Sequence, residues 1–220
     1  MAAKSTKSTK RIIRFKTQRR LGTELPGLGK PGALDRRPYP PGENGNKRRK
    51  YSDYALRLEA KQKIRFHYNI KEKQLRNFIK KSKKGSSTNW VNTLAGLLET
   101  RLDNIVFRLG MAPSIRAARQ LVSHKHVLVN GSVLNIGSAI VPNGATISIT
   151  EKAKENQAVI QATGSPRLEV PDFLRREDKG NLPSGVLQAI PTVAHIPFEF
   201  EPGLFTRIIC WKKPSRRCIR

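Results

Sequence analysis

The chain has 220 residues, and its 43 Lys and Arg against 16 Asp and Glu give a formal net charge of +27. Such a chain repels itself unless a polyanion surrounds it, and with 37% apolar and 6% aromatic residues part of it cannot offset its chain entropy by burial. Residues 1–84 carry +20 of the charge and the remainder only +7, an asymmetry that favours nucleic acid as the partner. The length suits two small modules.

A membrane-surface protein is the main alternative for so basic a chain. It would need an amphipathic helix with a bulky apolar face or a lipidation signal, and the sequence offers neither. No apolar run approaches the roughly 20 residues that span a bilayer. Cys210 and Cys218 are too few for a disulfide framework, which fits a reducing compartment. We predict a cytoplasmic protein with no membrane partner. An organelle interior stays an alternative, because Met1–Arg11 is typical of a transit segment as well as of an RNA-binding tail.

Residues 1–46 are predicted to form a basic arm followed by an extended segment rich in Gly and Pro. Cations recur through residues 4–20 and end at Arg19 and Arg20, with few apolar side chains between them. Runs such as Pro40-Pro41-Gly42 then forbid a long regular element. We expect this segment to lie against the partner and both arginines to contact phosphates.

Residues 47–100 are predicted to form a helical RNA-binding domain, with helices beginning near Ser52, near Lys71 and near Thr88 or Asn89. In the first helix, Arg57, Lys61 and Arg65 recur at intervals of four residues and so line one face, with no carboxylate interleaved on that face. A solvated helical face usually alternates signs, so phosphate contact is the sharper interpretation and a solvated face the alternative. The candidate contacts of this domain are Lys47, Arg48, Arg49, Lys50, Arg57, Lys61, Arg65, Lys80 and Lys83.

Residues 101–150 change from a helical period to a strand period. The first helix has one apolar face and ends at Gly110, and Ser114 is the predicted N-cap of the second. Asn130-Gly131 then predicts a hairpin, and Thr146–Ile149 predicts a further strand. The expected inward residues are Leu102, Ile105, Val106 and Leu109 in the first helix and Ile115, Ala118, Leu121 and Val122 in the second. The unit is two helices followed by a small antiparallel sheet.

Residues 20–150 resemble the small-subunit ribosomal protein S-four family in its bacterial and organellar form. The stretches that carry the resemblance are Arg101–Ala112, Ala117–His124, Val127–Gly131, Arg19–Gly22, Leu25–Gly27, Pro40–Glu59, Lys61–Lys63 and Arg65–Tyr68. The resemblance implies an α+β fold, in which an N-terminal basic arm and helical domain carry an inserted two-helix and small antiparallel-sheet RNA-binding module. It also implies a structural constituent of the small ribosomal subunit and not an enzyme.

Family members place the second helix of this module and the turn after it against RNA. Carried over by resemblance, the module's candidate RNA contacts are Arg101, Ser114, Arg116, Arg119, Gln120, His124, Lys125 and Asn130. Arg116 and Arg119 are favoured because a guanidinium grips phosphate oxygens in pairs and stacks on bases. An ordinary partly buried histidine is the equal alternative for His124 and for His126.

The resemblance also names partners. It implies binding to the 5′ domain of small-subunit ribosomal RNA, early nucleation of subunit assembly, and a place near the messenger RNA entry channel with an effect on translational accuracy. Neighbouring proteins of the S-five and S-three families, and messenger RNA itself, are the further expected partners. The low aromatic content favours recognition of RNA shape over single-strand sequence.

The chain departs from the family at both ends. Some members bind zinc through cysteines near their start, but residues 1–84 contain no cysteine, so we expect no metal and no cofactor. Residues 151–206 are predicted to pack back on the helical domain. The basic tail at 207–220 is interpreted either as an RNA-contacting extension or as a solvated end.

Two other functions compete with the ribosomal one. Pseudouridine synthases carry a similar module, and their catalytic aspartate lies in a context that Arg101-Leu102-Asp103 copies. Here, however, these residues open the first helix, where Asp103 is expected to pair or cap, and no length remains for a catalytic domain. A free RNA chaperone would lack the basic block of residues 40–84. No Gly-Lys-Ser or Gly-Lys-Thr loop supports nucleotide hydrolysis.

Overall fold

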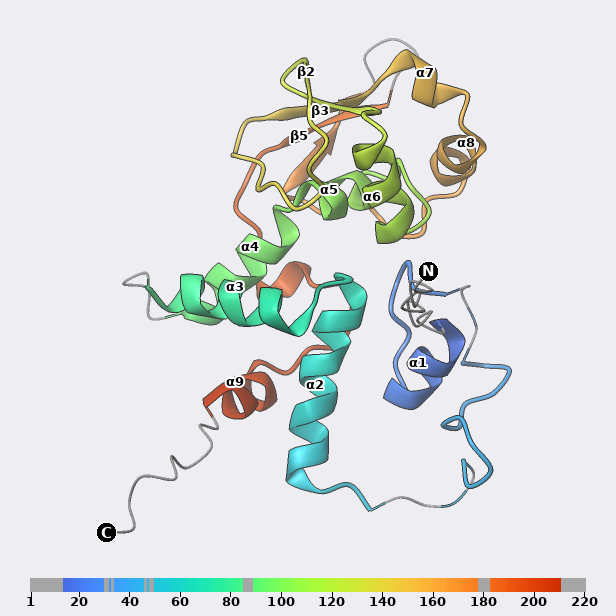
Figure 1. Cartoon of the computed structure of the whole chain (residues 1–220), viewed down its shortest axis with the longest axis vertical. Coiled ribbons are helices and arrows are strands. Elements are labelled where there is room, and N and C mark those ends of the chain that lie inside the picture. Colours follow the sequence, from blue (N-terminus) through green and yellow to red (C-terminus); the bar gives the residue numbers. More distant parts are fainter. Residues whose placement is uncertain are drawn as a thin grey trace, which may run out of the picture.

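The computed structural model describes residues 14–29, 32, 34–45, 47, 50–84, 89–177 and 183–210. Figure 1 shows a sheet with its helices at one end of the molecule and a group of longer helices at the other, with α4 (Trp90–Glu99) leading from one to the other. This is the α+β arrangement that the sequence predicts. Among the described residues, no helix is long and apolar enough to cross a membrane.

The helical part consists of α2 (Asp53–His67), α3 (Glu72–Lys84), α4 and α9 (Pro202–Cys210). Ser52 caps α2 as predicted, since its hydroxyl accepts a hydrogen bond from the amide of Ala55 at 3.3 Å. Figure 1 shows α9 lying beside α2, although about 140 residues of sequence separate them. The core of this part consists of Ile64, Tyr68, Ile70, Leu75, Ile79, Leu94, Leu98 and Phe205.

Residues 14–21, expected as the end of an extended arm, instead form helix α1 (Arg14–Leu21). The cause is a small apolar cluster in which Leu21, Leu25 and Leu28 pack against Phe66 and Phe198. This cluster attaches the N-terminal segment to the helical part. Three leucines spread over a Gly- and Pro-rich stretch give no helical period, so the sequence pattern did not show this cluster.

The sheet module begins with α5 (Leu102–Arg108) and α6 (Ile115–Ser123). All eight residues predicted to point inward are buried. Ser114 caps α6 as predicted, by accepting from the amide of Ala117 at 3.2 Å. The hairpin is also confirmed, with φ of 50° at Asn130 and 79° at Gly131 between strands β1 (Val127–Val129) and β2 (Ser132–Val133).

The sheet is antiparallel throughout and has the order β2-β1-β3-β5-β4. Strand β3 (Thr146–Ile149) lies at its centre, and β4 (Leu174–Arg176) and β5 (Ser184–Leu187) complete it. Helices α7 (Glu151–Lys154) and α8 (Gln157–Gly164) connect β3 to β4, and the short 3-10 helix η1 (Val193–His195) leads back toward α9. We refer to α5–α8 and the five strands as the sheet module.

The sequence predicted that residues 151–206 pack back on the helical part. In the structure they do not pack there as one segment. Phe173, Leu174 and Leu187 are buried in the core of the sheet module, and β5 pairs with β3 along its length. Gly185 of β5 lies so close to Leu109 that an added Cβ would meet that side chain at 2.5 Å. The last part of the segment, from η1 through Phe198 and Phe200 to α9, joins the helical part.

Candidate nucleic-acid interface

Helix α6 presents a polar face away from its buried side. Ile115, Ala118, Leu121 and Val122 face the core, so the residues between them, among them Arg116 and Gln120, face outward. Gln120, His124 and Lys125 are exposed and Arg116 is partly exposed. Lys125 follows the helix with a φ of 64°, a conformation that ends α6 and directs the next residues into β1. The predicted second helix and turn therefore do form one accessible surface.

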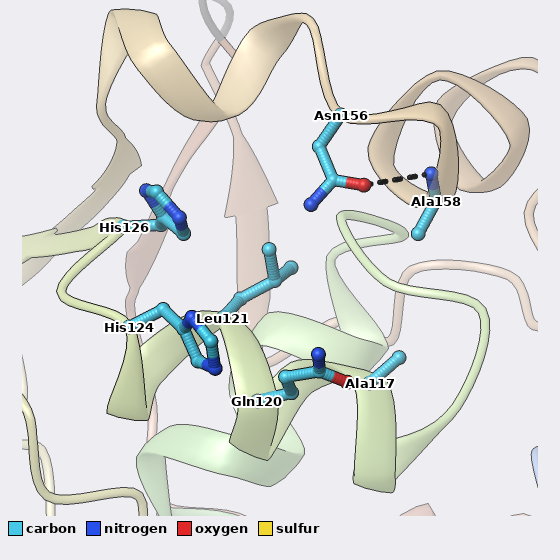
Figure 2. Close-up of a pocket in the computed structure, with 7 residues that line it drawn as sticks. All are labelled: Ala117, Gln120, Leu121, His124, His126, Asn156 and Ala158. Atoms are coloured by element: carbon cyan, nitrogen blue, oxygen red, sulfur yellow. Dashed lines mark hydrogen bonds between the residues drawn. The ribbon is translucent and has the colours of Figure 1, made fainter.

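A small pocket of about 120 Å³ opens beside this surface, between the end of α6 and the start of α8. Figure 2 shows Gln120, His124, His126 and Asn156 around it, with Leu121 at its base. The two imidazole rings stack at a centroid distance of 6.2 Å and an interplanar angle of 16°. Such a volume is far below the roughly 300 Å³ of a typical small-molecule site, so it suits one phosphate group or one base edge.

The polar groups around the pocket are suited to donate hydrogen bonds. Oδ1 of Asn156 accepts from the amide of Ala158 at 3.1 Å, which leaves its Nδ2 hydrogens for other acceptors (Figure 2). Gln120 contributes a second amide, and each imidazole has at least one N–H. A set of N–H donors without a carboxylate among its lining residues fits an anionic or carbonyl-rich ligand such as RNA. The sequence pattern did not point to Asn156 at this surface, although an Asn before Gln157–Gly164 signals an N-cap.

The expectation that Arg101 contacts RNA is wrong. Its side chain is 1% exposed, and its Nε and Nη2 donate to the two carboxylate oxygens of Asp103 at 3.2 and 3.0 Å. The guanidinium carbon also lies 5.7 Å from the centre of the Phe78 ring. Asp103 is thus paired as the structural interpretation predicted, and Arg101 serves the protein interior.

Arg119 is shared between the surface and the interior. Its side chain is 35% exposed, its Nε donates to Oδ2 of Asp103 at 3.1 Å, and its Nη1 donates to the carbonyl oxygen of Asn69 at 3.4 Å. It keeps only part of its guanidinium for a ligand.

Ser114 and Asn130 have structural partners of their own. Besides the cap at Ser114, Oδ1 of Asn130 accepts from the amide of Thr146 at 2.9 Å, which joins the hairpin turn to β3. The Asn130 side chain is nevertheless exposed, so its Nδ2 can face a ligand.

On α2, the expected face of three cations without carboxylates is not what the structure has. Arg57 lies 3.9 Å from Asp53, and Lys61 lies 3.0 Å from Glu72, which comes from α3. Arg65 lies over the ring of Phe66 at 4.9 Å. These cations are partly buried, whereas Lys47, Lys50 and Lys80 are exposed.

Two further candidates lie over aromatic rings. Lys83 is exposed and its Nζ lies 4.6 Å from the centre of the Trp90 ring. Arg19 donates from Nε to the carbonyl oxygen of Tyr39 at 3.0 Å and lies over that ring, whereas Arg20 is exposed. Arg48, Arg49 and residues 211–220 of the predicted basic tail lie outside the described residues, whereas the backbone of 207–210 belongs to α9.

Two buried titratable groups lie where the helical part meets the sheet module. Burial, together with the positive charge of Arg108, lowers the pKa of His67 from 6.5 to about 3. Burial and the neighbouring Glu99 raise the pKa of Tyr68 above its ordinary value. The His67 ring is therefore neutral and the Tyr68 hydroxyl protonated at neutral pH. Among the described residues, no group of three or more His, Cys, Asp and Glu side chains could hold a metal ion.

Comparison with known proteins assigns the family. Residues 9–99 match the ribosomal protein S4/S9 N-terminal domain, and residues 100–147 match the S4 domain. The chain is 57% identical over 191 residues to small ribosomal subunit protein uS4B of Bdellovibrio bacteriovorus, covering 87% of this chain and 92% of the relative. It is 41% identical to uS4 of Methylobacillus flagellatus, covering 84% and 89%, and 46% identical to uS4c of Porphyra purpurea, covering 80% and 86%. The chain belongs to the uS4 family of small ribosomal subunit proteins.

Proposed function

We propose that this chain is a structural component of the small ribosomal subunit and a primary binder of its ribosomal RNA. The observation that supports this most is the accessible surface at the end of α6, where Arg116, Gln120, His124 and Lys125 lie together beside a donor-lined pocket. Exposed lysines on the helical part extend the cationic surface. Phosphate neutralisation by both parts would release counterions and give affinity without reading base sequence.

The finer proposal is that the RNA is the 5′ domain, that binding nucleates subunit assembly, and that the bound protein lies near the messenger RNA entry channel and influences translational accuracy. The family resemblance supports these statements. A catalytic role gains no support from Asp103, because that carboxylate is 1% exposed and paired with two arginines.

Neighbouring proteins of the S-five and S-three families are the proposed protein partners. A groove between α2 and α9 supports a protein contact there, since three carboxylates line it against one cation. Its lining includes Glu59, Glu199, Glu201, Lys63, Phe200 and Leu204. Carboxylates repel phosphates, so this side of a very basic chain suits a basic protein better than RNA. Replacing Glu199 and Glu201 by lysine should leave RNA affinity intact or raise it, and should weaken protein association in reconstituted subunits.

The test of RNA binding compares a transcript of the small-subunit 5′ domain with an unrelated structured RNA across a salt series. The variant combines Arg116→Ala with Lys125→Gln, and Arg175→Gln combined with Lys152→Gln, at exposed positions of the sheet module, is the control that loses the same two charges. Arg119 is left unchanged because it also holds Asp103. The wild type should prefer the 5′ domain by at least tenfold, and the double variant should lower the slope of log affinity against log salt by about 2.

Equal affinity of the wild type for the two RNAs would contradict specific ribosomal recognition and favour a general RNA binder or chaperone. An unchanged salt slope in the double variant would instead remove α6 and its turn from the interface while leaving the ribosomal role intact. A control that loses as much affinity as the double variant would mean that charge alone decides binding.

A further inference from the structure

The helical part and the sheet module meet through polar groups. Their two hydrophobic clusters have no described residue in common, and several of the residues that bridge them are charged or hydrogen-bonding. Glu99, the last residue of α4, is 0% exposed, and Arg108 of α5 is 3% exposed. A buried carboxylate and a buried guanidinium are costly unless each is fully bonded, so their partners define the junction.

Glu99 bonds to residues on both sides of this junction. One carboxylate oxygen accepts from the Tyr68 hydroxyl at the end of α2 and from Nη2 of Arg108 at 3.0 Å. The other accepts from Nδ2 of Asn104 at 2.6 Å and from Nε of Arg108 at 3.2 Å. Tyr68 belongs to the core of the helical part, whereas Asn104 and Arg108 belong to α5 of the sheet module.

Two further hydrogen bonds also join the helical part, or the segment that leads to it, to the sheet module. Nη2 of Arg108 donates to the carbonyl oxygen of His195 in η1, on the segment that returns to α9. Arg119 joins α6 to Asn69, just after α2. Hydrogen bonds to charged groups have narrow distance and angle requirements, unlike apolar contacts, which tolerate sliding. A junction made of them specifies one relative orientation.

We infer that Glu99 is a positioning residue: it holds the sheet module at a fixed angle to the helical part, so that the cations of both contact one RNA at the same time. The inference rests on the proposed RNA-binding function and assigns it a geometric requirement. When two binding surfaces are rigidly joined, the second contact forms at a high effective concentration, and this gain is lost if the angle between them varies.

The orientation can be measured without RNA, by residual dipolar couplings of the free full-length protein. In the wild type, one alignment tensor should fit the amides of both α2–α4 and the sheet. In Glu99→Gln, which replaces one of the two carboxylate oxygens by an NH2 group that cannot accept from Arg108, each part should require its own tensor while its couplings remain those of a folded domain. Glu177→Gln is the matched control, because its partner Arg175 lies in the same part at 3.7 Å.

Tyr68→Phe provides a milder variant in case Glu99→Gln does not fold. It removes one hydroxyl from the junction and leaves the pair of Glu99 and Arg108 in place. Separate tensors in either folded variant support the inference, and a single tensor in Tyr68→Phe and in any folded Glu99→Gln overturns it.

RNA binding provides the second arm. Variants with separate tensors should bind the 5′ domain at least tenfold more weakly and with a shallower salt dependence, while Glu177→Gln matches the wild type. Unchanged affinity despite separate tensors would overturn the positioning role. Failure of the wild type to bind this RNA would refute the proposed function, and the coupling data would still decide the orientation.

Discussion

His67 shows how a single side chain can make the stability of this protein depend on pH. The ring is buried, with its centre 4.7 Å from that of Tyr68 and 5.1 Å from that of Phe198. Because its pKa falls from 6.5 to about 3 on folding, the unfolded chain binds a proton below pH 6.5 that the folded chain excludes. The contribution of neutral His67 to the free energy of unfolding is therefore fully present above pH 6.5. It is lost as the pH falls from 6.5 toward 3.

The predicted slope is about 1.4 kcal/mol per pH unit below 6.5, or about 2 kcal/mol between pH 6.5 and pH 5. Urea unfolding at pH 7.5, 6.5, 5.5 and 5.0 measures it. His67→Phe, which keeps a ring of similar size without a titrating nitrogen, should lack this part of the slope. Equal slopes in the two proteins would show that His67 does not take up a proton on unfolding.

At the scale of single residues, the sequence shows which side chains are cations but does not show which of them are buried. Arg101 and Arg116 look alike as cations at the start of two neighbouring helices. Their fates differ because Arg101 meets Asp103 and the ring of Phe78 in the interior, whereas Arg116 lies outward on α6. Such partners come together only in the folded chain, so spacing along the sequence cannot separate a buried guanidinium from a surface one.

Among the elements, α6 combines a structural and a proposed binding role in its cap residue. Ser114→Ala should lower the free energy of unfolding by about 1 kcal/mol, since the amide of Ala117 loses its acceptor. Ser114→Asp keeps an acceptor and adds favourable charge at a helix start, so its stability should stay near that of the wild type. The same aspartate should weaken RNA binding if the start of α6 faces phosphates.

Chemical unfolding and RNA titration of both variants separate the two roles. Ser52→Ala, at the cap of α2, is the control for a cap lost elsewhere. A Ser114→Asp protein that is stable and binds RNA as well as the wild type would place the start of α6 away from the RNA.

Helices with apolar periodicity and strong caps were predictable, and the last two strands were not. The helices α5 and α6 follow from their apolar spacing, from Gly110 and from Ser114. By contrast, β5 begins Ser184-Gly185, residues that signal a turn, because the space beside Leu109 admits no side chain. When a tertiary contact determines the residues of a strand, its sequence lacks the alternation of apolar and polar residues that predicts a strand.

At the scale of the whole molecule, the sheet module depends on chain that lies well beyond the S4-domain match at residues 100–147. Ending the chain at residue 150 would remove Phe173, Leu174 and Leu187 from the core and would expose the edge of β3. We predict that this truncated chain does not form a stable module. Loss of amide dispersion in NMR spectra and of a cooperative thermal transition would reveal it.

A chain ending after residue 190 serves as the control, because it keeps all five strands and should retain a folded module. If the chain that ends at residue 150 unfolds cooperatively with the wild-type transition, the last two strands are dispensable.

Composition predicted the polyanionic partner, because charge is additive along the chain. The completion of the sheet depends on which distant residues meet in the folded chain, and composition does not record this, so composition did not predict it.

Both hydrophobic cores are completed by residues near the C-terminal end of the sequence, which are synthesised late. Leu187 completes the core of the sheet module and Phe205, which is 0% exposed, completes that of the helical part. During synthesis neither core can close until nearly the whole chain has left the ribosome that makes it, whereas α1–α3 with their cations emerge much earlier. The nascent protein thus presents its basic segments while it still lacks a hydrophobic interior. Protection of these segments by RNA or by a chaperone during this interval would favour a high yield of folded protein.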